Sequence, residues 1–228
     1  MAYAAAAPSS KRLKRSFSAI SQPSQAMDVD VAQNRAIAGL KRKVKSLSAG
    51  VEKRNAFTTI ANTGVGTGGL LTSLDVVAQG DASTSRDGLT ITPLFVEWNV
   101  LFESEIADAY NIMGMMIVQA KGGAALTSAD FGGVGIPPSE AQLQRYTVLY
   151  NRTFLLENGQ LGDPVSGYAS YTKYSKYQGK VKVPRKIAYP DAGSASNTNS
   201  LHVWFISDSA AVNHPDVELL QARLAYHD

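Results

Sequence analysis

Clustered cationic side chains are the residues of this sequence whose type and spacing indicate the clearest chemistry. They form two runs, Lys11-Arg12-Leu13-Lys14-Arg15 and Lys41-Arg42-Lys43-Val44-Lys45. Up to Arg54 the chain carries 11 Lys and Arg against 3 acids, a balance of +8, whereas the remainder carries 11 against 16, a balance of −5. Cations neutralise phosphates and release counterions, which gives affinity without base specificity. The asymmetry therefore predicts a tail that meets a polyanion and a mildly acidic body.

Nucleic-acid binding is the interpretation that we favour for this tail, and three others stay open. The first run is typical of a nuclear-import signal, which would make an import receptor a partner. The tail could instead be merely solubilising. Ile37, Leu40 and Val44 have the spacing of a membrane-surface helix, but Gly39 interrupts it and a helix ordered on nucleic acid fits better. The residues expected to bind phosphate are Lys11, Arg12, Lys14, Arg15, Arg35, Lys41, Arg42, Lys43, Lys45, Lys53 and Arg54, the first four also being the import candidates.

A second basic stretch, from Lys173 to Lys186, is interleaved with tyrosines. Alternating aromatic and basic residues stack on and neutralise single strands in many nucleic-acid-binding proteins. The alternative, which we favour, is an edge strand that Lys180 and Lys182 protect from pairing with other chains. The tyrosines would equally suit a subunit interface.

Other chemistries find little support in the sequence. The stretch 64–69 fits G-x-G-x-x-G, but a strand is expected after it instead of the helix that a dinucleotide site needs. His202, His214 and His227 lack ligand spacing, and the chain has no cysteine. No nucleophile is paired with a base. We therefore expect no catalytic residues, no cofactor and no metal site, and leave calcium bridging between subunits open.

The segments that must position these residues are predicted to be strands, because apolar residues from Ser48 onward recur with a period of two. The clearest case lies in the range 91–103, where the residues expected to share one face are Leu94, Val96, Trp98, Val100 and Phe102. A capping box at Ser139 predicts one short helix. The start of the last segment also resembles a helix start, but its alternation favours a strand. The expected strands are 56–61, 70–78, 91–103, 110–119, 146–156, 178–189, 201–207 and 217–226.

These patterns predict an all-β protein with one eight-stranded antiparallel sandwich. Long amphipathic helices between strands are not evident, which disfavours βαβ folds. The expected organisation is a largely disordered basic arm over residues 1–47 and a shell of strands over 48–228. Hydrophobic residues make up 44% of the chain and charged residues 18%, enough to bury a core. No secretory signal or membrane-spanning stretch is evident, so we expect a soluble protein made in the cytosol that does not insert into membranes.

Four short motifs occur in the order found in one family. They are Val77-Ala78-Gln79-Gly80 with Arg86-Asp87-Gly88-Leu89-Thr90-Ile91, then Asp108-Ala109-Tyr110-Asn111-Ile112, then Tyr146-Thr147-Val148-Leu149-Tyr150, and finally Ala222-Arg223-Leu224-Ala225-Tyr226-His227-Asp228. Together they resemble the single jelly-roll coat proteins of small circular single-stranded DNA viruses that encode a rolling-circle replication protein. Satellite RNA virus coats are relatives of that family. The chain departs from the family at Met113 to Met115, near a usual Arg, and at Asn151, at a usual Asp.

The resemblance implies a jelly-roll capsid protein that self-assembles into an icosahedral T=1 shell of sixty copies around a single-stranded genome. It favours DNA over RNA, with the protein in the virion and in the host nucleus during assembly. The rival hypothesis is a non-viral β-sandwich module that binds single-stranded nucleic acid or carbohydrate without forming a shell. An enzyme is a distant third.

Overall fold

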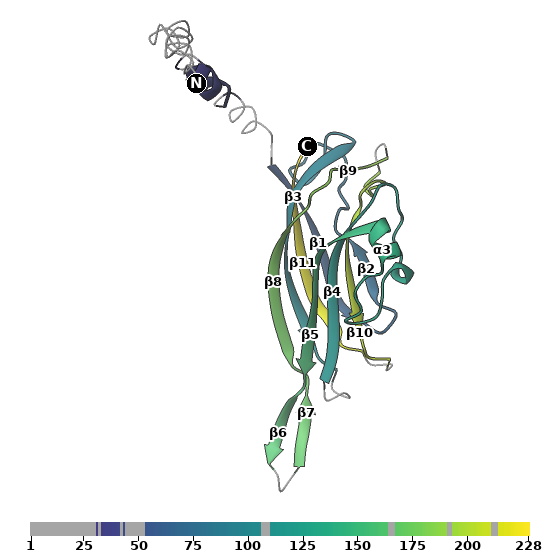
Figure 1. The fold of residues 1–228 in the computed structure, drawn as a ribbon. Coiled ribbons are helices and arrows are strands. Elements are labelled where there is room, and N and C mark those ends of the chain that lie inside the picture. The colour runs from purple at the N-terminus through teal and green to yellow at the C-terminus, as the bar shows by residue number, and fades with distance from the viewer. Residues whose placement is uncertain are drawn as a thin grey trace, which may run out of the picture. The chain divides into compact units, whose positions relative to one another are not determined.

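The computed structural model describes residues 31, 33–41, 43, 53–105, 110–163, 167–190, 193–210 and 214–228, with the backbone alone over 159–163 and 167–171 (Figure 1). The chain divides into two units, Met1–Val51 and Glu52–Asp228, which are considered separately. In the first unit, residues 33–41 are helical and exposed to solvent. The described part of the predicted disordered arm is therefore a helix whose surface is open to a partner.

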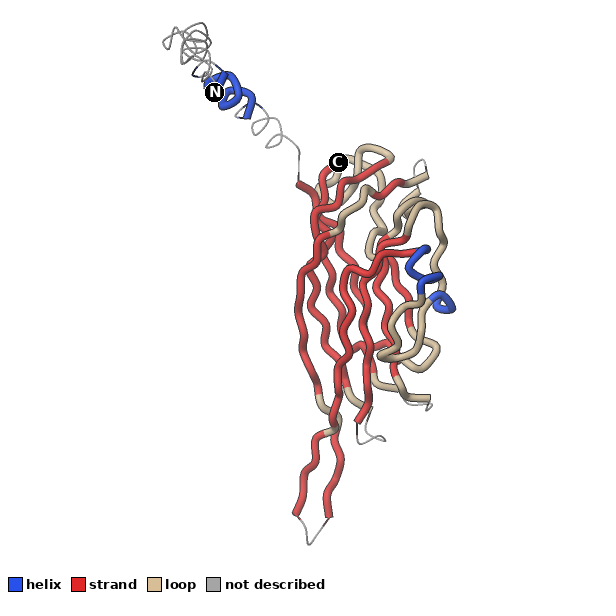
Figure 2. The backbone as a smooth tube through the Cα atoms, viewed as in Figure 1, coloured by secondary structure: helices blue, strands red, loops and turns tan. Residues whose placement is uncertain are grey.

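The second unit is a sandwich of two antiparallel sheets, which confirms the predicted all-β class (Figure 2). The first sheet has the order β1 (Lys53–Gly64), β11 (Asp216–His227), β3 (Thr90–Glu103) and β8 (Tyr174–Lys182), with β9 (Ile187–Ala188) beside β3. The second has the order β2 (Leu70–Ser73), β10 (Leu201–Ser207), β4 (Tyr110–Ala120) and β5 (Tyr146–Glu157). A separate hairpin consists of β6 (Gly159–Asp163) and β7 (Gly167–Tyr171).

Strand pairing in the sandwich is nested. Among the strands of the two main sheets other than the short β9, the first pairs with the last, β1 with β11, and β2 pairs with β10. Further inward, β3 pairs with β8 and β4 with β5. The chain thus folds back on itself as one long hairpin before the two sheets close over the core. Residues distant in sequence are consequently brought side by side on each sheet.

Alternation of buried and exposed side chains explains β3. Val96, Trp98, Val100 and Phe102 are buried between the sheets, as the period of two predicts. Leu94 breaks the phase because it is an extra residue on β3, where Phe95 and Pro93 face consecutive residues of β11. Burying one such large apolar side chain stabilises the fold by about 2 kcal/mol.

The strand β4 is buried on both faces, as its continuous apolar sequence predicts. Met113, Met115 and Ile117 belong to the core between the sheets. Met116 and Val118 belong to a second apolar cluster, which also contains residues of the connection 121–145. That connection, with η1 (Ser128–Asp130) and α3 (Glu140–Arg145), lies against the second sheet in Figure 2. Among the described residues no comparable layer covers the first sheet, and many of its outward side chains are exposed.

Most predicted element boundaries agree with the structure, and the exceptions have local causes. The capping box predicted at Ser139 is formed, because its backbone N–H donates to Gln142 Oε1 at 2.8 Å and starts α3. The C-terminal segment is a strand, not a helix. The predicted strand 70–78 ends at Ser73, since the chain then leaves the sheet and the Asp75 carboxylate accepts from Leu201 N instead. The predicted strand 178–189 is instead β8, which begins at Tyr174 and ends at Lys182, followed by the short β9. The strands β6 and β7 were not expected.

Two glycines are required by close packing of tryptophan rings. Gly69 has φ +66°, and an added Cβ would lie 1.9 Å from the Trp204 ring. An added Cβ at Gly179 would lie 2.4 Å from the ring of Trp98, its register partner on β3. Glycine at both positions therefore lets an indole ring pack directly against the backbone.

We predict that Gly69→Ala destabilises the sandwich by about 3 kcal/mol or more, because the methyl group overlaps the Trp204 ring and the left-handed backbone is strained. Chemical denaturation followed by tryptophan fluorescence measures the change. Gly68→Ala is the matched control, since a Cβ at that position meets nothing within 4 Å, and its stability should stay within about 0.5 kcal/mol. Equal stability of the two variants contradicts the packing argument.

Candidate nucleic-acid interface

The predicted phosphate-binding residues of the arm fall into two groups. Arg35, Lys41 and Lys43 lie on the exposed helical segment, where their side chains reach solvent. The other arm cations lie outside the described residues: Lys11, Arg12, Lys14, Arg15, Arg42 and Lys45.

Lys53 begins β1 and is exposed, as a phosphate-binding residue must be. Its ammonium group lies 4.8 Å from the centre of the Phe95 ring, and that of Lys180 lies 3.5 Å from the same ring. The negative face of an aromatic ring attracts cations by about 0.5–1 kcal/mol at exposed sites. The Phe95 ring thus makes cation–π contacts with two lysines, one from β1 and one from β8, although these strands are not neighbours in the sheet.

Arg54 differs from the other predicted cations because it is buried, with 7% of its surface exposed. Its guanidinium group donates to both carboxylate oxygens of Asp87 at 2.8 and 2.7 Å and to the backbone oxygen of Ser85 at 2.8 Å. It also pairs with Asp228 at 3.3 Å. Such forked contacts are specific and strong. Arg54 therefore holds the body together, and the phosphate-binding prediction rests on the exposed cations.

Two of the four family-like motifs, 77–91 and 222–228, meet around Arg54. Arg86 is fully buried, donates to the backbone oxygens of Gly88 and Gly193, and lies over the Tyr189 ring at 4.3 Å. The Tyr226 hydroxyl donates to Ser85 O at 2.8 Å, and burial raises the pKa of this tyrosine to about 12. We call this group, with Arg54, Asp87 and Asp228, the arginine latch. It joins the loop 79–88 to the start of β1 and the end of β11.

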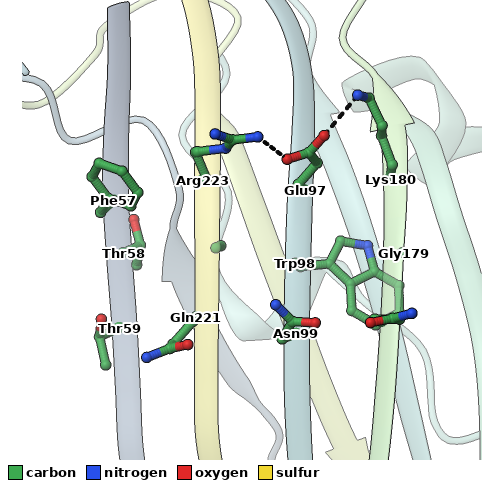
Figure 3. A pocket seen from close by; sticks show the side chains of 12 residues that line it. Phe57, Thr58, Thr59, Glu97, Trp98, Asn99, Gly179, Lys180, Gln221 and Arg223 are labelled. Carbon is green, nitrogen blue, oxygen red and sulfur yellow. Dashed lines mark hydrogen bonds and ion pairs between the residues drawn. The ribbon is translucent and has the colours of Figure 1, made fainter.

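The outward face of the first sheet carries a row of charges. Register places Phe57, Arg223, Glu97 and Lys180 side by side on β1, β11, β3 and β8. Figure 3 shows the Glu97 carboxylate between Lys180, at 2.7 Å, and Arg223. Hydrogen bonds from these two cations lower the pKa of Glu97 below its usual value. The only acid of this row is thus matched by two cations.

A second row, of uncharged polar side chains, crosses the same four strands two residues further along. It consists of Thr59, Gln221, Asn99 and Gln178, which are register partners and all exposed. We call it the amide row. Within the described part of the chain, none of these four side chains makes a hydrogen bond. Its amides are therefore free to bind a ligand.

The basic stretch 173–186 forms an edge strand, as we expected. β8 ends the first sheet, and Lys176, Lys180 and Lys182 point to solvent from it. Tyr177 instead contributes to the core, with its ring 4.3 Å from that of Phe154. Tyr174 donates its hydroxyl to Glu103 at 3.3 Å. The lysines of this stretch are available to a polyanion, whereas Tyr177 is not available for stacking on bases.

A small hollow between β2, β10 and the connection 121–145 is lined by two titratable groups, the buried Asp75 and the half-buried His202. Burial raises the pKa of Asp75 from 3.8 to about 6, although Ser196 and Leu201 N donate to its carboxylate. Burial lowers the pKa of His202 from 6.5 to about 4, and its ring contacts Ser73 and Ser200 at 3.3 and 2.8 Å. Both residues line the same hollow. His202 is thus a neutral, hydrogen-bonded strand residue.

The other candidate sites considered in the sequence take part in turns and packing. The glycine-rich stretch 64–69 is a turn between β1 and β2, without the helix that a dinucleotide site requires. Among the described residues, no three acidic or histidine side chains cluster as metal ligands. Nor does any helix in these ranges have the length and apolar character to cross a bilayer. Where the family carries an Arg, Met113 and Met115 fill the core, a place unsuited to charge, while Asn151 is exposed on β5.

Comparison with known proteins adds little to this picture. No model of a protein family and no curated protein matches the chain. A solved structure of the infectious bursal disease virus Gx strain is similar over 76% of this chain and 33% of that chain, with 15% sequence identity and a TM-score of 0.24. The chain therefore spans about a third of the viral chain. At this TM-score the likeness does not establish a shared fold. The resemblance to the coat-protein family stays a prediction from the sequence.

Arg54→Ala should destabilise the sandwich by about 3 kcal/mol, because it leaves Asp228 largely buried without its cation. Urea unfolding measures the loss. The neighbouring Lys53→Ala is the control and should cost less than about 1 kcal/mol, the value of an exposed cation on an aromatic ring. If the two variants unfold at the same urea concentration, Arg54 has no structural role.

We predict that the two titratable groups of this hollow have opposite effects on how stability depends on pH. Asp75 has a raised pKa, so its contribution to stability is full below pH 3.8 and is lost as pH rises through about 6. His202 has a lowered pKa, so its contribution is full above pH 6.5 and is lost as pH falls through about 4. On acidification from about pH 7 to about pH 4, Asp75→Asn should lose stability relative to wild type. His202→Gln should gain it, each by on the order of 2 kcal/mol.

Unfolding free energies of the wild type and both variants at the two pH values test this expectation. Comparing variants cancels the other titrating groups. Variant curves parallel to wild type would show that neither side chain titrates in this window.

Proposed function

We propose that this chain is the coat protein of a small virus, which assembles into a closed shell and packages a single-stranded genome through its basic arm. The observation that carries the proposal is the division of charge, +8 up to Arg54 and −5 beyond it, in a chain whose second part is a β-sandwich. Cations concentrated N-terminal to an acidic body can neutralise packaged phosphates while the outside of a particle stays free of that positive charge.

The nested strand pairing supports a jelly roll. The order β1-β11-β3-β8 facing β2-β10-β4-β5 follows from pairing the first strand with the last and working inward. Eight-stranded, double-sheet jelly rolls are used by viral capsid and lectin domains. The architecture is therefore compatible with a shell subunit and with the rival, a module that binds nucleic acid or carbohydrate.

Exposed apolar side chains on the body favour association between copies. Tyr110 on β4 and Leu155 on β5 lie close together, because Leu155 pairs with Ile112. Ile136 and Leu143 are exposed on the connection that covers the second sheet. Separated apolar areas on one subunit suit a closed assembly in which each subunit meets several neighbours.

In its finer form the proposal is a T=1 shell of sixty copies, with single-stranded DNA favoured over RNA as the genome. It locates the protein in the virion and, through Lys11, Arg12, Lys14 and Arg15, in the host nucleus during assembly. It assigns the chain no catalytic role and no cofactor. These finer points follow from the motif resemblance and from the arm's composition.

Neutralising the arm of the full-length chain tests the proposal. Replacing its eight clustered cations by Gln should leave closed particles in negative-stain micrographs while their 260/280 nm absorbance ratio falls well below that of wild-type particles. We call this the arm-neutral variant. The matched control replaces the lysines of the same clusters by Arg and keeps the charge, so it should package as wild type does. The eight positions are Lys11, Arg12, Lys14, Arg15, Lys41, Arg42, Lys43 and Lys45.

Two outcomes contradict the proposal. An unchanged absorbance ratio in the arm-neutral variant would remove the arm's role in packaging. A wild-type protein that stays monomeric and binds oligonucleotide in a salt-sensitive manner would instead favour the non-viral binding module.

A further inference from the structure

We propose that the outward face of the sheet β1-β11-β3-β8 is a second nucleic-acid surface, on which the amide row contacts bases and the lysines of β8 contact phosphates. The inference rests on the proposed function for the class of its partner. It adds a role for the body, because the arm alone supplies charge without base contacts. Four-stranded sheets bind single-stranded RNA in a comparable way when bases lie across their face.

The chemistry of the amide row matches base edges. A side-chain amide presents a donor and an acceptor in one plane, and Asn and Gln bind adenine through two such hydrogen bonds. Asn99, Gln178 and Gln221 are exposed and make no hydrogen bond among the described residues, so binding breaks no internal contact. With strands about 4.8 Å apart, the row spans roughly 14 Å, the length of about four stacked bases.

Charge around the amide row favours a polyanion over a neutral carbohydrate. Lys176, Lys180 and Lys182 flank it on β8, and Arg223 lies on β11 in the charged row. Glu97, the one acid in that row, is engaged by two of these cations. A phosphate backbone along β8 would therefore meet positive charge.

The acids of this sheet gather at its other end. Burial and repulsion by Glu218 and Asp216 raise the pKa of Glu103, and burial with repulsion by Glu105 and Glu218 raises the pKa of Asp216. Such a cluster repels phosphate. The charge gradient along β3 therefore limits the surface to the part that contains the amide row and the charged row.

An aromatic side chain completes the surface. Phe57 stands at the β1 end of the charged row with 65% of its surface exposed (Figure 3). Stacking of a base on an exposed aromatic ring contributes about 1–3 kcal/mol to single-strand binding. Phe57 thus offers a stacking platform beside the amides.

Fluorescence anisotropy with labelled oligo-dA and oligo-dT of about 15 nucleotides, on the full-length arm-neutral variant, tests the inference at low salt. That variant should still bind and should prefer dA. Adding Asn99→Ala and Gln221→Ala should weaken dA binding about tenfold and remove the preference. Adding Lys180→Gln and Lys182→Gln should weaken both probes alike and flatten the salt dependence.

Gln144→Ala, which removes an exposed amide from α3, is the matched control and should change nothing. Thermal unfolding of each variant checks that these surface changes leave the fold intact. The inference is overturned if the arm-neutral variant binds neither probe, or if the amide-row variant binds both as its parent does. Amide-dependent binding of a neutral glycan in place of DNA would overturn it in favour of carbohydrate. Whether the packaging proposal fails is determined separately, from the particles in the micrographs and from their 260/280 nm absorbance ratio.

Discussion

The arginine latch is the interaction on which the architecture of the sandwich depends. Arg54 lies on β1, Asp87 in a loop and Asp228 after β11, yet the buried Arg54 guanidinium group forms charge-assisted contacts with both carboxylates. A guanidinium group removed from water is tolerated only with such partners, so the three segments are held in one relative position. The latch thereby fixes the end of the β1 and β11 ladder, from which the register of the whole sheet follows.

Much of the fold could be predicted from the sequence because strand periodicity is a local property. The segment 201–207 forms a strand as expected, and the Ser139 capping box starts a helix. The wrong predictions concern segments whose structure is determined by tertiary contacts. Leu74 to Ala78 have apolar character typical of a strand, but Asp75 turns away to bind Leu201 N and Ser196. The strands β6 and β7 are too brief for a period to emerge.

The candidate site was predictable only in part, for a similar reason. Composition located the cations, but it could not separate Lys53, which is exposed, from Arg54, which is buried, since the difference lies in Asp87 and in the distant Asp228. The amide row was missed altogether. Its four residues are scattered over the sequence and become a row only through the register of four strands. Surfaces built across strands in this way carry no signal in a single linear segment.

The central position of β11 in its sheet also has a consequence for the time course of folding. β11 lies between β1 and β3, so until it is synthesised β1 has no neighbour and β3 has one unpaired edge. Contacts between segments distant in the sequence form late, since closing a long loop is entropically costly. A growing chain on the ribosome thus cannot complete this sheet before β11 has emerged. The strands β1 and β3 therefore acquire the neighbour that they share only after every other strand of the body has been synthesised.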